Sequence, residues 1–184
     1  NGDFNTAIGY YANASAANLT NATAAGSGAV VDASDKVRIG NTNVNSIGGQ
    51  VGWTTFSDGR YKKNIKDDVK GLSFINSLRQ ITYTVDVNGL NAHYDYTRKD
   101  SGDYQNEASN IVYNGFIAQD VEAAAKKLNY NFSGVDKPKT QDGLYGLRYA
   151  DFVVPLVKAV QELSEQNDEL KKQNDDLQQR ISKL

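Results

Sequence analysis

A heptad repeat near the end of the chain limits its fold more than any other feature. From Leu156 to Leu184, apolar and asparagine residues recur at alternating spacings of four and three, with polar residues at nearly all other positions. This is the a and d pattern of a parallel coiled coil. A monomeric helix that lies on a domain is the alternative, and such a helix would have only this narrow stripe to bury. The residues expected in the coiled-coil core are Leu156, Val160, Leu163, Asn167, Leu170, Asn174, Leu177, Ile181 and Leu184.

Two of the a positions carry asparagine, at Asn167 and Asn174. A buried asparagine at an a position lowers stability but fixes the register and the oligomeric state, and in peptides it favours two strands. The heptad rules by themselves therefore lean towards a dimer.

Residues 1–50 follow a different pattern, rich in Ala, Gly, Asn, Thr and Ser. They contain a degenerate repeat at Ala7–Ala12 and Ala24–Ala29, with a weaker copy at Val37–Asn41. Short strands separated by glycine at such intervals predict a β-roll or β-solenoid, in which small residues let stacked coils approach closely. A disordered linker of low complexity is the alternative, and the strand-like Val30–Val31 counts against it.

Residues 51–152 are predicted to form a small mixed α/β domain. Their apolar positions switch between helical spacing and strand alternation. The turn pair Asn88-Gly89, within a polar stretch, predicts a hairpin or a long loop. The expected elements are a helix at 72–78, a strand at 81–85, the polar insert at 86–110, a strand at 111–116 and a helix at 118–128.

Composition and charge argue against several kinds of site. A net charge of −2 gives the chain no basic face for nucleic acid, and no apolar run is long enough for membrane insertion. The one histidine, His93, lies in a stretch expected to be an exposed loop, and there is no cysteine, so neither a metal nor a cofactor is expected. The hydrophobic fraction of 39% is low for one large core, which predicts that the chain buries apolar surface against sister chains.

A polar motif between the first two segments carries the clearest chemistry. The residues at its fixed positions are Ser57, Asp58, Arg60, Lys62, Asn64 and Ile65. They resemble, without a gap, the opening signature of the intramolecular chaperone domains at the C-termini of phage endosialidases, tailspikes and tail fibres. Gly115–Glu122 and Gly146–Phe152 resemble the second and third blocks of that family. Three blocks in the same order make the resemblance specific.

The resemblance implies that the chain folds and is then cut. Members of the family help a fibre to trimerise and fold, after which the bond before the motif serine is cleaved and the chaperone releases itself. In this sequence that bond is Phe56–Ser57, with Ser57 as the nucleophile and Lys62 as the base. The supporting motif residues are Asp58, Arg60 and Asn64.

A serine and a lysine perform such a reaction without histidine when burial or a nearby cation lowers the pKa of the lysine. Five positions separate Ser57 from Lys62, so the two do not share a helix face and must be brought together by a turn or by assembly. Burial that depends on assembly would make the cut a checkpoint for correct trimerisation. The alternative is that Ser57 is only a turn or helix-capping residue.

The expected architecture is α+β: a β-roll or β-solenoid-like stalk at 1–50, a small mixed α/β chaperone domain at 51–152 and a parallel coiled-coil helix at 153–184. By resemblance, the assembly is an intertwined homotrimer. The expected enzyme is a self-cleaving serine endopeptidase that turns over once, in cis. A non-cleaving trimerisation cap of an adhesin or receptor-binding fibre is the alternative.

The expected partner is the chain itself. A host-surface glycan or protein is a second expected partner of the upstream fibre, and the tyrosines of the polar insert suit such contacts. These tyrosines are Tyr94, Tyr96 and Tyr104.

The expected location is a phage virion tail fibre or spike, or a bacterial cell surface.

Overall fold

The computed structural model of the chain describes residues 2–94 and 107–183. They form two compact units, and each is described by itself. We call Asn1–Thr55, Ile81–Gly115 and Pro138–Leu144 the roll unit, and Phe56–Gln80, Phe116–Lys137 and Tyr145–Leu184 the helical unit. Each unit therefore combines segments that lie far apart in the sequence.

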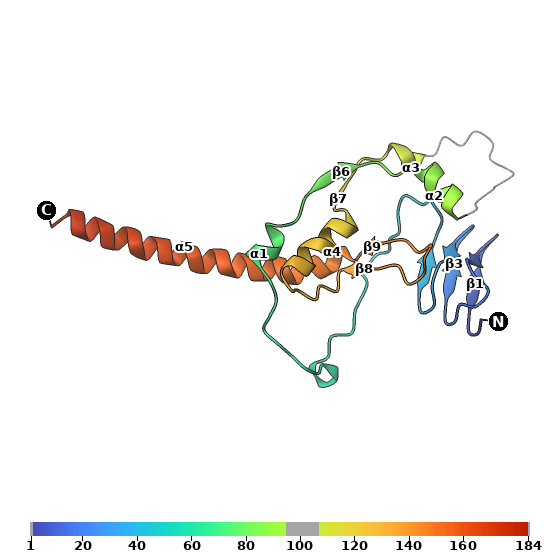
Figure 1. Cartoon of the computed structure of the whole chain (residues 1–184), viewed down its shortest axis with the longest axis horizontal. Coiled ribbons are helices and arrows are strands. Elements are labelled where there is room, and N and C mark those ends of the chain that lie inside the picture. Colours follow the sequence, from blue (N-terminus) through green and yellow to red (C-terminus); the bar gives the residue numbers. More distant parts are fainter. Residues whose placement is uncertain (1, 95–106, 184) are drawn as a thin grey trace. The chain divides into compact units, whose positions relative to one another are not determined.

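The roll unit begins with short strands that stack in parallel (Figure 1). One sheet has the order β1-β3-β5, and β2 pairs with β4 in a second sheet. Thr6 pairs with Thr23 and Thr23 with Val37, so successive coils lie over one another and bury one another, as in solenoids. The strands are β1 (Thr6–Ile8), β2 (Asn13–Ala14), β3 (Thr23–Ala25), β4 (Val30–Val31) and β5 (Val37–Ile39).

Small side chains fill the interior of the roll and set the spacing of its coils. Gly9 and Gly26 turn the chain with φ angles of 129° and 113°, which other residues rarely adopt. A Cβ on Gly9 would lie 2.6 Å from the backbone of Gly26, so the two turns stack because neither has a side chain. The buried cluster consists of Leu19, Ala22, Ala24, Ala29 and Val31.

The roll unit also contains elements from later in the chain. β6 (Ile81–Tyr83) and β7 (Tyr113–Gly115) pair antiparallel, and α2 (Val87–His93) and α3 (Glu107–Asn110) lie between them in the sequence. The hairpin or loop predicted at Asn88-Gly89 is wrong, because both residues lie inside α2. Asp86 starts this helix by accepting a hydrogen bond from the Gly89 N–H at 2.8 Å. His93, expected in an exposed loop, is exposed but ends the same helix.

The helical unit has an aromatic core around Phe74, which is fully buried. The rings of Tyr130 and Phe132 lie 5.1 Å and 4.9 Å from it at tilted or edge-on angles, the geometry that aromatic pairs prefer. The elements of this unit are η1 (Gly59–Tyr61), α1 (Leu72–Ile75), α4 (Ala118–Lys127), β8 (Val135–Asp136), β9 (Gly146–Leu147), η2 (Tyr149–Phe152) and α5 (Val153–Ile181).

Glu122 on α4 is the centre of a polar network in the helical unit. Its carboxylate accepts hydrogen bonds from Lys126 at 2.6 Å, from Lys137 at 2.7 Å and from the Tyr145 hydroxyl at 2.9 Å. The bond from Lys126, followed by those from Lys137 and Tyr145, lowers the pKa of Glu122 from 4.5 to about 2. The network joins the helix to two later segments of the chain.

Two faces of α5 have different surroundings. Near its start Pro155 and Ala159 are buried, and the Glu162 carboxylate accepts a hydrogen bond from the Leu72 N–H at 2.7 Å, which ties α5 to α1. The predicted coiled-coil residues lie on another face, where Leu163 is 52% exposed and Leu170 is 65% exposed. The described part of the chain therefore leaves this seam uncovered.

The prediction of mixed α/β structure with a long C-terminal helix is confirmed (Figure 1). A coiled coil needs a second chain, so the coiled coil and its strand number stay predictions, and Leu184 lies outside the described residues. Among the described residues, no helix combines the length and the apolar character that a membrane span requires.

Substitution of Gly9 by alanine should destabilise the roll. The added Cβ would collide with the Gly26 backbone, and alanine is strained at a φ of 129°. We expect the free energy of unfolding, measured by urea denaturation, to fall by roughly 1–3 kcal/mol. Gly48→Ala is the control, because nothing lies within 4 Å of a Cβ placed there. Equal losses in the two variants would contradict the stacking argument.

Glu122 should make the stability of the helical unit depend on acid. Its pKa is lowered from 4.5 to about 2 in the folded chain, so its contribution is fully present above 4.5 and is lost as the pH falls towards 2. The difference in unfolding free energy between the wild type and Glu122→Gln should shrink over this range. Glu165→Gln, an exposed position on α5, is the control. A difference that does not change with pH would contradict the network.

Candidate functional site

A tight turn holds the motif residues together. Asp58 precedes η1, and its Oδ1 accepts a hydrogen bond from the Arg60 N–H at 2.9 Å, which caps this short helix. The Arg60 side chain folds back onto the same carboxylate, with Nε 3.1 Å from Oδ1 and Nη2 2.6 Å from Oδ2. A bidentate pair of this kind fixes direction as well as distance, so it defines the shape of the turn.

The turn brings Ser57 and Lys62 into contact. After η1 the Lys62 N–H donates to the carbonyl oxygen of Gly59 at 3.1 Å, which reverses the chain. The Lys62 Nζ then donates a hydrogen bond to the Ser57 Oγ at 2.8 Å. This distance is within the range in which a proton passes between a nucleophile and a base.

Asn64 follows the lysine in a left-handed conformation, with a φ of 54°. Asparagine enters this region more readily than other residues with a side chain, because its short amide can bond the local backbone. The family motif includes Asn64 but does not say why asparagine is needed there. The left-handed backbone at this position gives a physical reason for asparagine.

Electrostatic attraction stabilises the turn. The Arg60 side chain, followed by the Arg60 backbone N–H, lowers the pKa of Asp58 below its ordinary value of 3.8. The same contact raises the pKa of Arg60. The turn therefore keeps its ion pair at neutral pH, directly beside Ser57 and Lys62.

The site is exposed in the single chain. Ser57 and Lys62 are both exposed, and Trp53 and Phe56 on the upstream side are 86% and 101% exposed. Water around a lysine stabilises its charged form, whereas a catalytic lysine must be desolvated or lie beside another cation. The geometry of a nucleophile and base is present, but the burial that would activate the base is not provided by the described residues.

The second and third motif blocks meet in the core of the helical unit. Phe116 of the second block stacks on Tyr149 and Phe152 of the third, with ring centroids 6.1 Å and 5.2 Å apart. The Phe116 N–H donates to the Tyr149 hydroxyl at 3.2 Å. These blocks hold the start of α4 against the start of α5.

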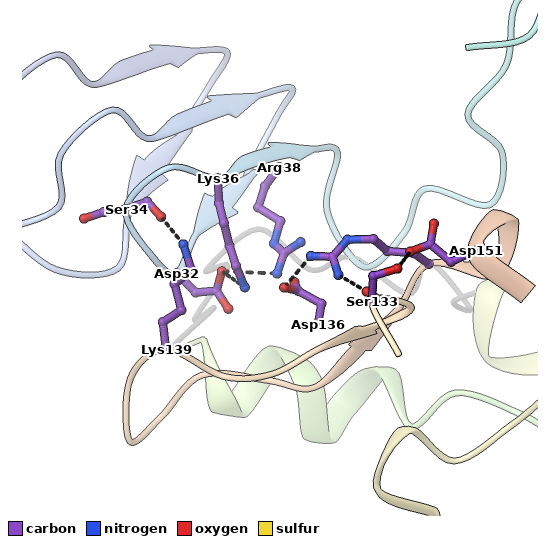
Figure 2. Close-up of polar contacts among 9 residues, drawn as sticks. Asp32, Ser34, Lys36, Arg38, Ser133, Asp136, Lys139 and Asp151 are labelled. Carbon is purple, nitrogen blue, oxygen red and sulfur yellow. Dashed lines mark hydrogen bonds and ion pairs between the residues drawn. The ribbon is translucent and has the colours of Figure 1, made fainter. Parts of the chain in front are cut away.

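Arg148 of the third block anchors a neighbouring loop, whose Ser133 and Asp136 are labelled in Figure 2. It donates to the Ser133 carbonyl oxygen at 2.7 Å and to Asp136 Oδ1 at 2.8 Å. The Ser133 hydroxyl in turn donates to Asp151 at 2.8 Å. The polar residues of this block are therefore used in structural contacts.

Tyr94, singled out for binding, lies just after α2 in the roll unit. Burial, followed by the negative charge of Asp32, raises the pKa of Tyr94, and the positive charge of Arg38 opposes this. Tyr96 and Tyr104 lie outside the described residues. Tyr94 lines a groove in the roll unit. The sequence did not predict this groove, because its other residues come from distant segments of the chain.

Comparison with known proteins identifies the motif region. Residues 57–130 match the family described as chaperone of endosialidase. The match begins at Ser57 and includes the second block, so the resemblance to this chaperone family is confirmed. The chaperone-of-endosialidase family is also named as a peptidase family. No curated protein and no solved structure matches the chain.

Arg60→Gln should raise the pKa of Asp58 towards its ordinary value of 3.8, because the variant loses the largest cause of the lowering. The carboxyl carbon signal of Asp58, followed by NMR as a function of pH, measures this change. Arg79→Gln is the control, since Arg79 pairs with Asp120 instead. An unchanged Asp58 titration in Arg60→Gln would contradict the turn geometry.

Proposed function

We propose that the chain is an intramolecular chaperone that promotes trimerisation and folding of a fibre or surface protein and then cuts itself at Phe56–Ser57. One observation carries the proposal. The Lys62 Nζ lies 2.8 Å from the Ser57 Oγ, at the residue where the match to the chaperone-of-endosialidase family begins. The description of the family supports the chaperone role, and its peptidase name agrees with cleavage.

The place of Ser57 directly after the scissile bond determines the chemistry. The Ser57 Oγ attacks the carbonyl carbon of Phe56 while a neutral Lys62 amine takes the hydroxyl proton. The carbon–nitrogen bond breaks, the Ser57 nitrogen receives that proton, and the Phe56 acyl group remains as an ester on Oγ. Water then hydrolyses the ester to a Phe56 carboxylate and the Ser57 hydroxyl. Each chain reacts once, in cis, and its downstream product begins with a free serine amine.

Burial by sister chains would activate this site. Phe56 and Tyr61 are both more than 80% exposed beside it, and exposed aromatic rings of this kind are typical of a surface that another molecule covers. Covering them would also remove water from Lys62. Loss of hydration favours the neutral amine that the reaction needs. Cleavage would then follow assembly and report that it is complete.

The uncovered seam of α5 supports self-association. Leu163, Leu170 and Leu177 are each more than half exposed. Burying a leucine fully is worth roughly 1.5–3 kcal/mol, so a coiled coil through this seam would stabilise an assembly substantially. We propose an intertwined homotrimer, in which the number three rests on the family resemblance, against the lean of Asn167 and Asn174 towards two strands.

The family also suggests where the parent protein acts. We propose that it is a phage tail fibre or spike, or a bacterial surface protein, with any host-surface glycan or protein bound by the upstream fibre. The net charge of −2 gives no support for nucleic-acid binding, and no apolar run of the sequence is long enough for membrane insertion.

A non-cleaving trimerisation cap is the second candidate, and the exposure of Ser57 and Lys62 favours it. In that case the hydrogen bond between them is a surface contact of a turn. The upstream fibre would stay covalently attached, and the coiled coil alone would set the oligomeric state.

Intact mass spectrometry and denaturing gels of freshly expressed protein distinguish the two candidates. We expect wild type to yield fragments 1–56 and 57–184, and Ser57→Ala to stay whole. Lys62→Arg keeps the charge but cannot act as a base, so cleavage should slow by roughly 10²–10⁴-fold. Lys63→Arg is the matched control, because it changes the neighbouring lysine and should still cleave.

A full-length chain in wild type and in every variant would reject self-cleavage and leave the trimerisation cap. Cleavage that persists in Lys62→Arg would reject the dyad. Native mass spectrometry of Ser57→Ala separates the two roles, because a chaperone whose cut follows assembly should still form the oligomer without it.

A further inference from the structure

The proposed cut passes through the roll unit. This unit contains the upstream residues as far as Thr55, but it also contains Ile81–Gly115 and Pro138–Leu144, which lie downstream of Phe56–Ser57. After cleavage the unit would therefore consist of two separate polypeptides. The contacts within the roll unit would then decide whether the two polypeptides separate.

Among the described residues, two side-chain hydrogen bonds join the upstream and downstream parts of the roll unit. The Thr42 hydroxyl donates to Asn91 Oδ1 at 2.6 Å, in a partly buried position on α2. The Lys139 Nζ donates to the carbonyl oxygen of Ser34 at 3.2 Å (Figure 2). One downstream segment thus contacts the end of the roll and the other contacts the coil around β4.

Tyr94 also lies near the upstream part, because it lines the same groove as Asp32. It is partly buried, and the negative charge of Asp32 contributes to the raised pKa of its phenol. Asp32 is itself only 5% exposed and forms an ion pair with Arg38 at 3.2 Å (Figure 2). The Tyr94 phenol, downstream of the cut, therefore lies close to the ion pair of Asp32 and Arg38, upstream of the cut.

The two downstream segments are joined to each other. The Nε2–H of His93, at the end of α2, donates to the carbonyl oxygen of Asp142 at 2.8 Å. We call residues 81–94 and 138–144 together the clamp. Because its segments are tied, the bond that Asn91 accepts from Thr42 and the bond that Lys139 donates to Ser34 must break together for the clamp to leave.

The groove between clamp and roll has a mixed polar and apolar lining. Its volume is about 760 Å³, and it is lined by Asn13, Leu19 and Val30 upstream and by Tyr94, Lys139 and Thr140 downstream. Interfaces within one chain resemble transient protein–protein interfaces, which are more polar than obligate ones. The mixed lining therefore suits a clamp that holds the roll reversibly.

We propose that the clamp keeps the two products of self-cleavage bound to each other, so that cutting the bond and releasing the chaperone are separate events. The partner of the clamp is the upstream product, residues 1–56 of the same protein. This inference rests on the proposed cleavage at Phe56–Ser57. The covalent link keeps the clamp at a high effective concentration over the roll, and the cut turns this contact into a dissociable one.

The test separates retention from self-cleavage by cutting the chain with an external protease. A recognition sequence for a site-specific protease is inserted between residues 56 and 57 of full-length Ser57→Ala protein. After complete digestion, size-exclusion chromatography and native mass spectrometry show whether the two fragments stay together. Wild type without added protease tests self-cleavage independently.

We expect the digested fragments to elute as one species. Asn91→Ala/Lys139→Ala should raise the dissociation constant of the product pair by about tenfold or more, since a net hydrogen bond is worth a factor of roughly 2–12. Asn76→Ala/Lys127→Ala is the matched control, because both residues are exposed in the helical unit. Thermal unfolding of each undigested variant checks that the fold is kept.

Fragments that separate as soon as the chain is cut would overturn the proposal. So would fragments that stay together equally well in Asn91→Ala/Lys139→Ala, because retention would then come from contacts other than the clamp.

Discussion

The structure depends on one constraint, which is that α5 has two faces that need cover and the described part of the chain covers one of them. Pro155 and Ala159 are buried near its start, whereas Leu170 and Ile181 remain more than 60% exposed along the predicted seam. Apolar surface left exposed along a whole helix is typical of chains that become stable only as an assembly.

In our account the reaction at the motif turn depends on the same association, although the turn itself does not. Short-range contacts, above all the pair of Asp58 and Arg60, suffice to place Lys62 on Ser57 within one chain. They do not bury the lysine, which stays exposed beside Phe56. In our account local sequence supplies the geometry of the reaction and association supplies the dry surroundings, so neither acts alone. The clamp adds a second stage, because contacts within the roll unit outlast the bond that is cut.

The sequence predicted what depends on neighbouring residues and missed what depends on distant ones. The heptad predicted the long helix α5, and apolar spacing predicted α4, because one face of each repeats every three or four residues. Asn88-Gly89 predicted a turn, but capping by Asp86 places both residues in a helix. The contact of Ser57 with Lys62 followed from a motif, although the turn that makes it and the left-handed Asn64 were not foreseen. The clamp and its groove combine segments separated by many residues, which no local pattern reveals.

The central claim is that assembly activates Ser57 and Lys62. The most direct test is to produce the chain by cell-free translation at a series of protein concentrations, and to follow the cleaved fraction and the oligomeric fraction over time. If assembly provides the burial, cleavage at Phe56–Ser57 should accelerate with concentration and should appear only in the oligomer. A cleavage rate that is the same at every concentration, with cut monomers at the earliest times, would contradict the account.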